Sequence, residues 1–300
     1  MKIVIAGSSG FLGTALRRSL ALQGHDVIRL VRRQGGAADE STWDPYAGTL
    51  DQSLVDSADV VVNLAGSPTA GNPHSKSWAC ELRESRVTTT AVLAEAVARS
   101  QQAGGSTAFL AGNGISYYGD HGDEVVREDA DSRGDALLTE VTRDWQAAAD
   151  PARQAGARVC ILRTSPVIDR ANPPLKQMLP LFKLGLGSRL GDGRQYFPII
   201  SLRDWVGATT HLANDAESSG AFNLCCPEVP TNREFTDALA DAVGRRARLA
   251  APASVLKVAA GRMAPEILGS LRTEPAALRE AGYTFQDDNA REVIASALRR

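Results

Sequence analysis

The sequence has no run of about eighteen apolar residues, the length that a helix needs to cross a lipid bilayer. It also lacks a basic segment followed by an apolar core at its start, because residues 3–6 already form a strand pattern. Its formal net charge of −2 gives no excess of basic residues that would favour nucleic acid or an anionic membrane. We therefore expect a cytoplasmic protein with no nucleic acid or membrane partner.

Patterns for metal binding and disulfides are missing as well. The four cysteines form no Cys-x-x-Cys pair, and the four histidines lie far apart with no His-Glu-x-x-His motif. We expect no metal site and reduced structural thiols at Cys80, Cys160, Cys225 and Cys226. The 300 residues, 43% of them hydrophobic, suffice for one large domain or for a large domain with a small lobe.

A glycine turn near the start of the chain is the most informative stretch. Residues 3–6 are apolar without alternation, as in a strand buried on both faces, and a helical pattern with Leu12, Leu16 and Leu20 follows. The Gly-x-x-Gly-x-x-Gly spacing between them predicts a tight turn whose amides hold the pyrophosphate of a dinucleotide. The expected contacts are Gly7, Ser8, Ser9, Gly10, Phe11, Leu12 and Gly13.

The second strand, residues 26–31, ends where a dinucleotide fold often places an acidic residue for the adenosine ribose. This chain has Val31 there, followed by Arg32 and Arg33. A guanidinium can bind a 2′-phosphate as a fork, whereas a carboxylate would repel it. The arginines therefore favour NADP(H); alternatively, they are solvated loop residues.

The rest of the N-terminal half alternates strands and helices. Residues 59–66, 107–111 and 158–163 have strand character, and helical stretches are expected at about 77–99 and 137–149. We predict an α/β protein with a Rossmann-type, doubly wound parallel sheet. The end of the third strand, with Leu64, Ala65 and Gly66, should pass beneath the dinucleotide.

The character of the chain changes after Thr164. Five prolines and four glycines between residues 166 and 198 predict loops, and Thr231 with Glu234 forms a capping-box pattern at the start of a helix. Further helical patterns lie at 254–260, 265–271, 274–281 and 288–298. We predict a Rossmann domain at 1–165, with strands around 200–225 returning to it, and substrate-side loops with a smaller, mostly helical C-terminal lobe at 166–300.

Several motifs resemble the extended short-chain dehydrogenase/reductases, and more narrowly their NAD-dependent epimerase-like subfamily, whose members are labelled nucleoside-diphosphate-sugar epimerases or cell-division inhibitors. The motifs are the glycine turn, Asn63-Leu64-Ala65-Gly66, Tyr117-Tyr118-Gly119, Trp43-Asp44-Pro45, Leu162-Arg163-Thr164, Gly191-x-Gly193-Arg194-Gln195 and Ala281-Gly282-Tyr283-x-Phe285. The resemblance covers nearly the whole chain. It implies cofactor contacts at the glycine turn, Val31, Arg32, Leu64, Ala65, Glu81, Arg86 and Val167.

The usual catalytic groups of that superfamily are absent. It uses a tyrosine as acid or base, a lysine four residues later and a serine that orients the substrate. No Tyr-x-x-x-Lys occurs in this sequence; Leu137 and Val141 occupy the tyrosine and lysine positions, and Asn113 occupies that of the serine. Tyr117, Tyr118 and Asn113 are the remaining candidates for proton donation and carbonyl polarisation, or else they are packing and capping residues.

Two functions therefore stay open at the level of sequence. The chain is an NADP(H)-dependent oxidoreductase or epimerase-like enzyme acting on a small carbonyl, hydroxyl or nucleotide-sugar-like compound. Alternatively, it binds NADP(H) as a sensor or scaffold without turnover. A lyase or isomerase working in the same cleft is a third possibility. On the substrate side we expect Arg194, Gln195 and Tyr196, because binding groups concentrate on loops.

Overall fold

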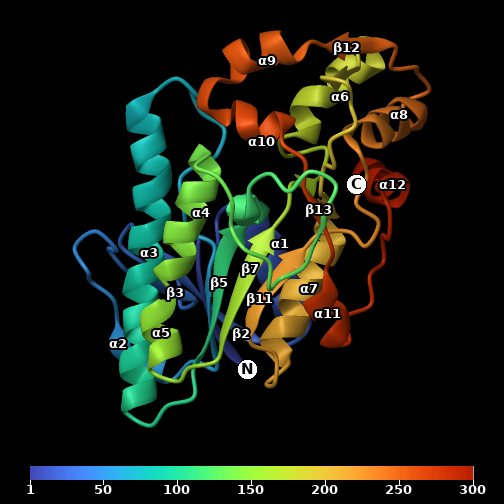
Figure 1. The fold of residues 1–300 in the computed structure, drawn as a ribbon. Coiled ribbons are helices and arrows are strands. Elements are labelled where there is room, and N and C mark those ends of the chain that lie inside the picture. Colours follow the sequence, from blue (N-terminus) through green and yellow to red (C-terminus); the bar gives the residue numbers. More distant parts are fainter. Residues whose placement is uncertain (300) are drawn as a thin grey trace.

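A computed structural model describes residues 1–299 of the chain. Its centre is a sheet of seven parallel strands in the order β11-β7-β5-β4-β1-β2-β3 (Figure 1). In chain order the strands are β1 (Lys2–Ala6), β2 (Asp26–Val31), β3 (Glu40–Thr42), β4 (Val60–Asn63), β5 (Ala108–Gly114), β7 (Val159–Thr164) and β11 (Gly220–Leu224). The strand order reverses between β1 and β4, which is where doubly wound folds bind their ligands. The predicted Rossmann-type fold class is confirmed.

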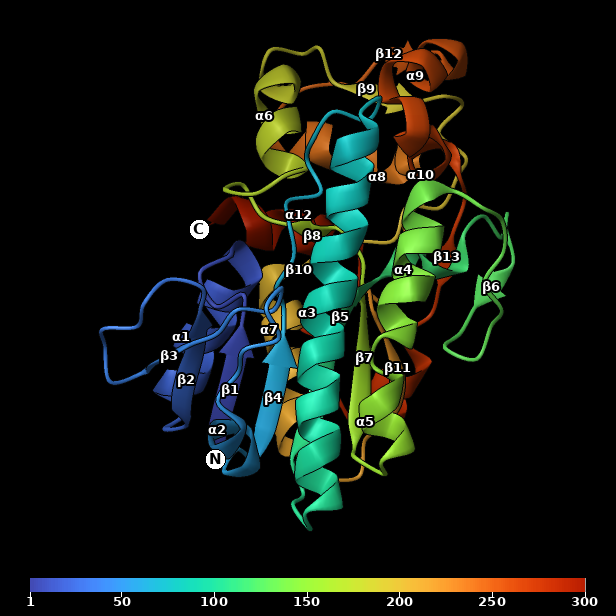
Figure 2. The ribbon, with the colours of Figure 1, turned by 90° about the vertical axis from the view of Figure 1, so that its left-hand side faces the viewer.

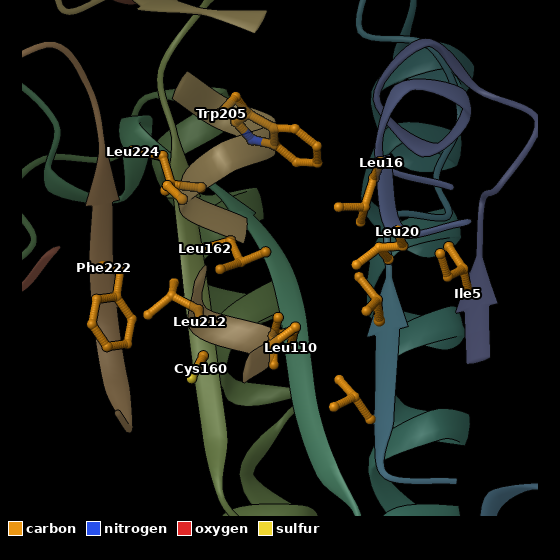
Figure 3. Packing of buried hydrophobic residues seen from close by; sticks show 14 of the residues in the cluster. Ile5, Leu16, Leu20, Leu110, Cys160, Leu162, Trp205, Leu212, Phe222 and Leu224 are labelled. Atoms are coloured by element: carbon orange, nitrogen blue, oxygen red, sulfur yellow. The ribbon is translucent and has the colours of Figure 1, made fainter. Parts of the chain in front are cut away.

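Helices cover both faces of this sheet, and the alternation of side chains along each strand explains why. Ile3 and Ile5 of β1 point to one face, where they pack against helix α1 (Phe11–Leu22) and helix α7 (Leu202–Asn214). Figure 3 shows Leu16 and Leu20 of α1 with Trp205 and Leu212 of α7 in this layer. Val4 and Ala6 point to the other face.

That other face is covered by three helices, α2 (Gln52–Asp56), α3 (Lys76–Gln102) and α5 (Asp150–Gln154). Helix α4 (Leu137–Ala147) lies beside α3, and Figure 2 shows the upper parts of both helices extending past the sheet toward the C-terminal lobe. Within residues 1–299 no helix is both long and apolar enough to cross a membrane.

The C-terminal lobe lies above the carboxyl edge of the sheet (Figure 1). Its core consists of buried residues from α6 (Leu175–Lys183), α8 (Asn232–Ala242) and α12 (Ala290–Arg299). The lobe also contains α9 (Ala253–Ala260), the 3-10 turn η2 (Gly261–Met263) and α10 (Ala264–Leu268). Three two-stranded sheets join more distant segments: β8 (Val167–Ile168) with β10 (Ile200–Ser201), β9 (Ser188–Leu190) with β12 (Leu249–Ala251), and β6 (Val125–Val126) with β13 (Arg272–Thr273).

One prediction for the segment after Thr164 is wrong. Its prolines and glycines indicated loops throughout, yet α6 forms within it and contains Pro180. Pro180 has no backbone N–H and so leaves one helical hydrogen bond unmade, but it is exposed, where water can take the place of that bond. Leu175 and Phe182 on the same helix are buried. Burial of two such side chains stabilises by roughly 2 kcal/mol each, which offsets the cost of the proline.

The segment from 200 onward is shared between the two parts of the molecule. Strand β11 joins the main sheet beside β7, whereas β10 pairs with β8 outside it. Helix α7 covers the sheet face beside α1, and α11 (Ala276–Glu280) lies against β11. Thr231 and Glu234 form the predicted capping box at the start of α8. The chain therefore crosses between the sheet and the lobe several times after residue 166.

Candidate functional site

The glycine turn is packed so closely that side chains would not fit at two of its positions. Gly7 has φ +76°, and a Cβ atom there would lie 2.5 Å from the carbonyl carbon of Leu64. A Cβ atom at Gly13 would lie 2.2 Å from the carbonyl oxygen of Gly7. The turn therefore lies directly against the residues that follow β4, and the start of α1 lies directly against the turn, as the predicted roles of these glycines require.

Gly10 differs from the other two glycines because the protein leaves room beside it. A Cβ atom there would meet only the Gly7 carbonyl oxygen, at 3.4 Å. Gly10 is the N-cap of α1 and supplies no side chain to bind the first amides of the helix. Free amides at a helix start attract a phosphate group, so the turn fits the pyrophosphate of a dinucleotide.

The buried side-chain amide of Asn63 holds the end of β4 in place through both its nitrogen and its oxygen. Asn63 donates to the Thr90 hydroxyl at 2.8 Å, and its carbonyl oxygen accepts from the backbone amide of Ala65 at 3.0 Å. Leu64 donates its backbone amide to Ala6 at the end of β1. These bonds fix the segment of Leu64, Ala65 and Gly66 next to Gly7, as the sequence predicts.

The two arginines after β2 have different surroundings. Arg33 donates to the carboxylate of Glu40, which also lies 3.0 Å from Arg29 and is 2% exposed. Hydrogen bonds from Arg33 and from backbone amides hold the pKa of Glu40 below its usual range. Arg32 is exposed and forms no hydrogen bond or ion pair with any residue from 1 to 299. Arg32 is therefore the cation that is free to bind a phosphate.

Arg86 of α3 is a buried cation without a carboxylate partner among the described residues. It is 9% exposed and donates to the carbonyl oxygens of Leu82 and Ser67, each at 3.0 Å. Its guanidinium carbon lies 5.2 Å from the ring centre of Trp145. Burial lowers the pKa of Arg86 to about 10, so the group is still charged at neutral pH. A buried charge of this kind fits an anionic ligand.

The remaining cofactor candidates differ in how far they are exposed to solvent. Val31 ends β2, and its carbonyl oxygen accepts from Trp43. Glu81 is exposed on α3, whereas Val167 is buried in β8. Ser8 is buried, Ser9 is exposed, and Phe11 and Leu12 are partly buried against the core.

The two residues predicted to stand in place of the tyrosine and lysine are apolar and buried. Leu137 is 7% exposed and Val141 is 2% exposed, and both pack with Ala79 of α3. They border a cavity of about 490 Å³ that opens between α3, α4 and η2. No hydroxyl or amine is supplied at these two positions.

Two of the three catalytic candidates are engaged inside the protein. The Tyr118 hydroxyl is buried, donates to Asn223 at 2.7 Å and accepts from Arg163 at 2.6 Å. Burial raises the pKa of Tyr118 to about 12. Asn113 donates to the Thr142 carbonyl oxygen and accepts from the Gly114 amide. These contacts argue against direct access of a substrate to either side chain.

Tyr117 is the partly exposed member of the three candidates. It packs against Tyr118, and the guanidinium carbon of Arg163 lies 3.8 Å from the centre of its ring. Sequence reasoning did not assign Arg163 a role. Its contacts join β7 to the 3-10 turn after β5 and, through Gln146, to α4. The sequence around Arg163 contains no pattern that would predict these contacts.

The predicted substrate residues do not line the first cavity. Arg194 and Tyr196 border a second cavity of about 540 Å³, together with Asp123, Thr231 and Arg233. Gln195 donates its side-chain amide to the Leu190 carbonyl oxygen, which holds its loop in place. Among residues 1–299, no group of three or more His, Cys, Asp or Glu is placed to hold a metal ion.

The family model of the NAD dependent epimerase/dehydratase family matches residues 3–225 of this chain. The chain belongs to this family. A second model, a domain of unknown function numbered 1731, matches residues 251–297, which include α9, α10, α11 and most of α12.

Relatives of this family member are similar over nearly their whole length. Epimerase family protein Mb2239 of Mycobacterium bovis is 40% identical over 99% of this chain and 98% of its own. The human epimerase family protein SDR39U1 is 31% identical over 95% of each chain. A crystal structure of the human protein with NADPH has a TM-score of 0.87 and 29% identity, covering 99% of both chains.

A structure of a nucleoside-diphosphate sugar epimerase from Corynebacterium glutamicum is also similar to this member of the family. Its TM-score is 0.79 with 34% identity, and it covers 99% of this chain but 58% of the other. The likeness thus extends through the C-terminal lobe as well as the sheet.

Proposed function

We propose that this chain binds NADP(H) at the glycine turn and reduces a small carbonyl compound, as an atypical short-chain dehydrogenase/reductase. The main support for NADP(H) is the unpaired Arg32 directly after β2, because a free guanidinium there favours binding of the 2′-phosphate. The NADPH in the crystal structure of human SDR39U1 supports the same choice. Gly7, Gly10 and Gly13 provide the cradle for the pyrophosphate, and Arg86 provides a second positive charge.

When bound, the reduced nicotinamide supplies hydride chemistry. The chain itself has to bind the substrate, exclude water and provide a proton for the carbonyl oxygen. Tyr117 is the candidate for the proton, since Tyr118 and Asn113 are engaged with protein groups. Arg194, Gln195 and Tyr196 stay predictions for substrate binding.

One observation favours a second candidate function, a protein that binds NADP(H) without turnover. Leu137 and Val141 leave the positions of the usual acid and its lysine apolar and buried. The two functions differ in one measurable property. Purified protein is mixed with NADPH and a panel of small aldehydes, ketones and imines, and the absorbance of NADPH is followed.

For the reductase we expect substrate-dependent loss of NADPH absorbance, which Tyr117→Phe should slow by at least about 100-fold, since general acid catalysis typically contributes about 100- to 10,000-fold. Binding of NADPH, measured by calorimetry, should be the same in this variant. Tight NADPH binding with no consumption across the panel would instead support the second candidate.

Replacement of Arg86 tests the second positive charge. We expect Arg86→Met to weaken NADPH binding by about 10- to 100-fold, because a hydrogen bond from a charged group contributes about 1.5–3 kcal/mol. The matched control is Arg83→Met on the same helix, since Arg83 is exposed and paired with Asp144. Equal cofactor affinities of the two variants would remove Arg86 from the cofactor site.

A further inference from the structure

The cavity beside Leu137 and Val141 has an apolar floor and a charged rim. Ala79, Leu137 and Val141 form the floor, and they belong to one packed cluster. The rim includes Lys76 at the start of α3 and Arg262 in η2. The ring of His74 lies on the rim against Gly261, where an added Cβ atom would be 2.7 Å from it. The cavity thus joins α3 and α4 to the C-terminal lobe.

The charges on the rim are not balanced within the protein. Arg83 is paired with Asp144 at 2.6 Å, which ties α3 to α4 below the opening. Lys76 and Arg262 form no ion pair or side-chain hydrogen bond with any described residue. Glu140 is the carboxylate that lines the cavity. With His74 counted as neutral, the unpaired groups leave a single net positive charge, which matches a monoanion better than a dianionic phosphate.

The apolar floor provides a surface that can bind an apolar group in place of the usual tyrosine and lysine. Leu137 and Val141 replace two polar side chains by apolar ones next to the position at which the superfamily carries out its chemistry. An apolar floor beneath a cationic rim binds a molecule with an apolar body and one anionic end. The second cavity also has cations, Arg194 and Arg233, but no leucine, valine or alanine side chain lines it, so it has no comparable apolar floor.

We propose that this cavity, rather than the loop of Arg194, Gln195 and Tyr196, is the substrate site and that it takes a carboxylate with an apolar body. Lys76 and Arg262 bind the carboxylate, and Leu137, Val141 and Ala79 contact the body. The inference rests on the proposed function for its reference to a substrate, but the binding of the anion does not depend on turnover.

The test uses 4-phenylbutyrate as the anionic probe and 4-phenylbutan-1-ol as a neutral probe with the same body. Calorimetry on the full chain should show the acid binding at least about 10-fold more tightly than the alcohol, the discrimination expected for one charge-assisted contact. Arg262→Gln and Lys76→Gln should each remove most of that difference. Both side chains are exposed, so thermal unfolding should confirm that the variants fold as the parent does.

Arg233→Gln, at the second cavity, is the matched control and should bind the acid as the parent does. Equal affinity for acid and alcohol, or a loss caused by Arg233→Gln with none caused by Arg262→Gln, would overturn the proposal. The proposed reductase function fails separately. Binding of the acid without NADPH consumption would contradict the reductase function and still support the proposed carboxylate site. Turnover of carbonyl compounds without binding of the acid would contradict the carboxylate site and still support the reductase function.

Discussion

Gly7→Ala is expected to destabilise the protein by about 3 kcal/mol and to weaken NADPH binding by at least about 10-fold. About 1–2 kcal/mol comes from the positive φ of +76°, and a similar amount comes from overlap with a neighbouring strand. The new Cβ atom would lie 2.5 Å from the backbone of Leu64 and 2.7 Å from that of Ala65. Relief of this overlap has to shift the glycine turn away from the residues after β4, and both segments are proposed to contact the cofactor. Thermal unfolding and calorimetry measure the two effects.

Gly24→Ala is the control for the backbone strain alone. Gly24 has a φ of +80°, but nothing lies within 4 Å of its missing Cβ atom. We expect a loss of about 1–2 kcal/mol and unchanged NADPH affinity. If both variants lost the same stability and both kept the cofactor, the close contact between Gly7 and Leu64 would have no functional role.

Arg32→Asp is expected to weaken NADPH binding by about 10- to 100-fold and to improve NADH binding or leave it unchanged. The variant replaces a free guanidinium by a carboxylate, which repels a 2′-phosphate and can accept from ribose hydroxyls. The range corresponds to the loss of a hydrogen bond from a charged group. The two affinities are measured by calorimetry on the same preparation.

Arg246→Asp makes the same change of charge on the exposed lobe and should affect neither cofactor. Arg33→Gln should have a smaller effect than Arg32→Asp, because Arg33 is held by Glu40. A loss of NADPH affinity as large in Arg246→Asp as in Arg32→Asp would mean that overall charge, and not the position of Arg32, sets the preference.

The sheet could be predicted from the sequence because its signals are local. Uninterrupted apolar runs mark β1, β4 and β5, and α1 follows the glycine turn with buried residues at Leu16 and Leu20. The boundaries are less exact: the strand expected at 59–66 ends at Asn63, where Asn63 turns its amide toward Thr90. The capping box of α8 was predictable because both of its residues lie within four positions.

Other features depend on contacts between distant residues and could not be predicted in this way. Glu40 forms an ion pair with Arg33 and none with Arg32, although the sequence gives no reason to expect a difference between these adjacent arginines. Tyr118 lies between Arg163 and Asn223, which are 45 and 105 residues away. The helix containing Pro180 forms because its apolar residues meet the core of the lobe. Each of these outcomes is decided by tertiary packing.

The central claim is that this chain holds NADP(H) through the glycine turn and Arg32. Its most direct test is a calorimetric titration of the parent protein with NADPH and with NADH under the same conditions. The account predicts that NADPH binds at least about 10-fold more tightly, as one charge-assisted phosphate contact requires. Equal affinity for the two cofactors, or tighter binding of NADH, would contradict it.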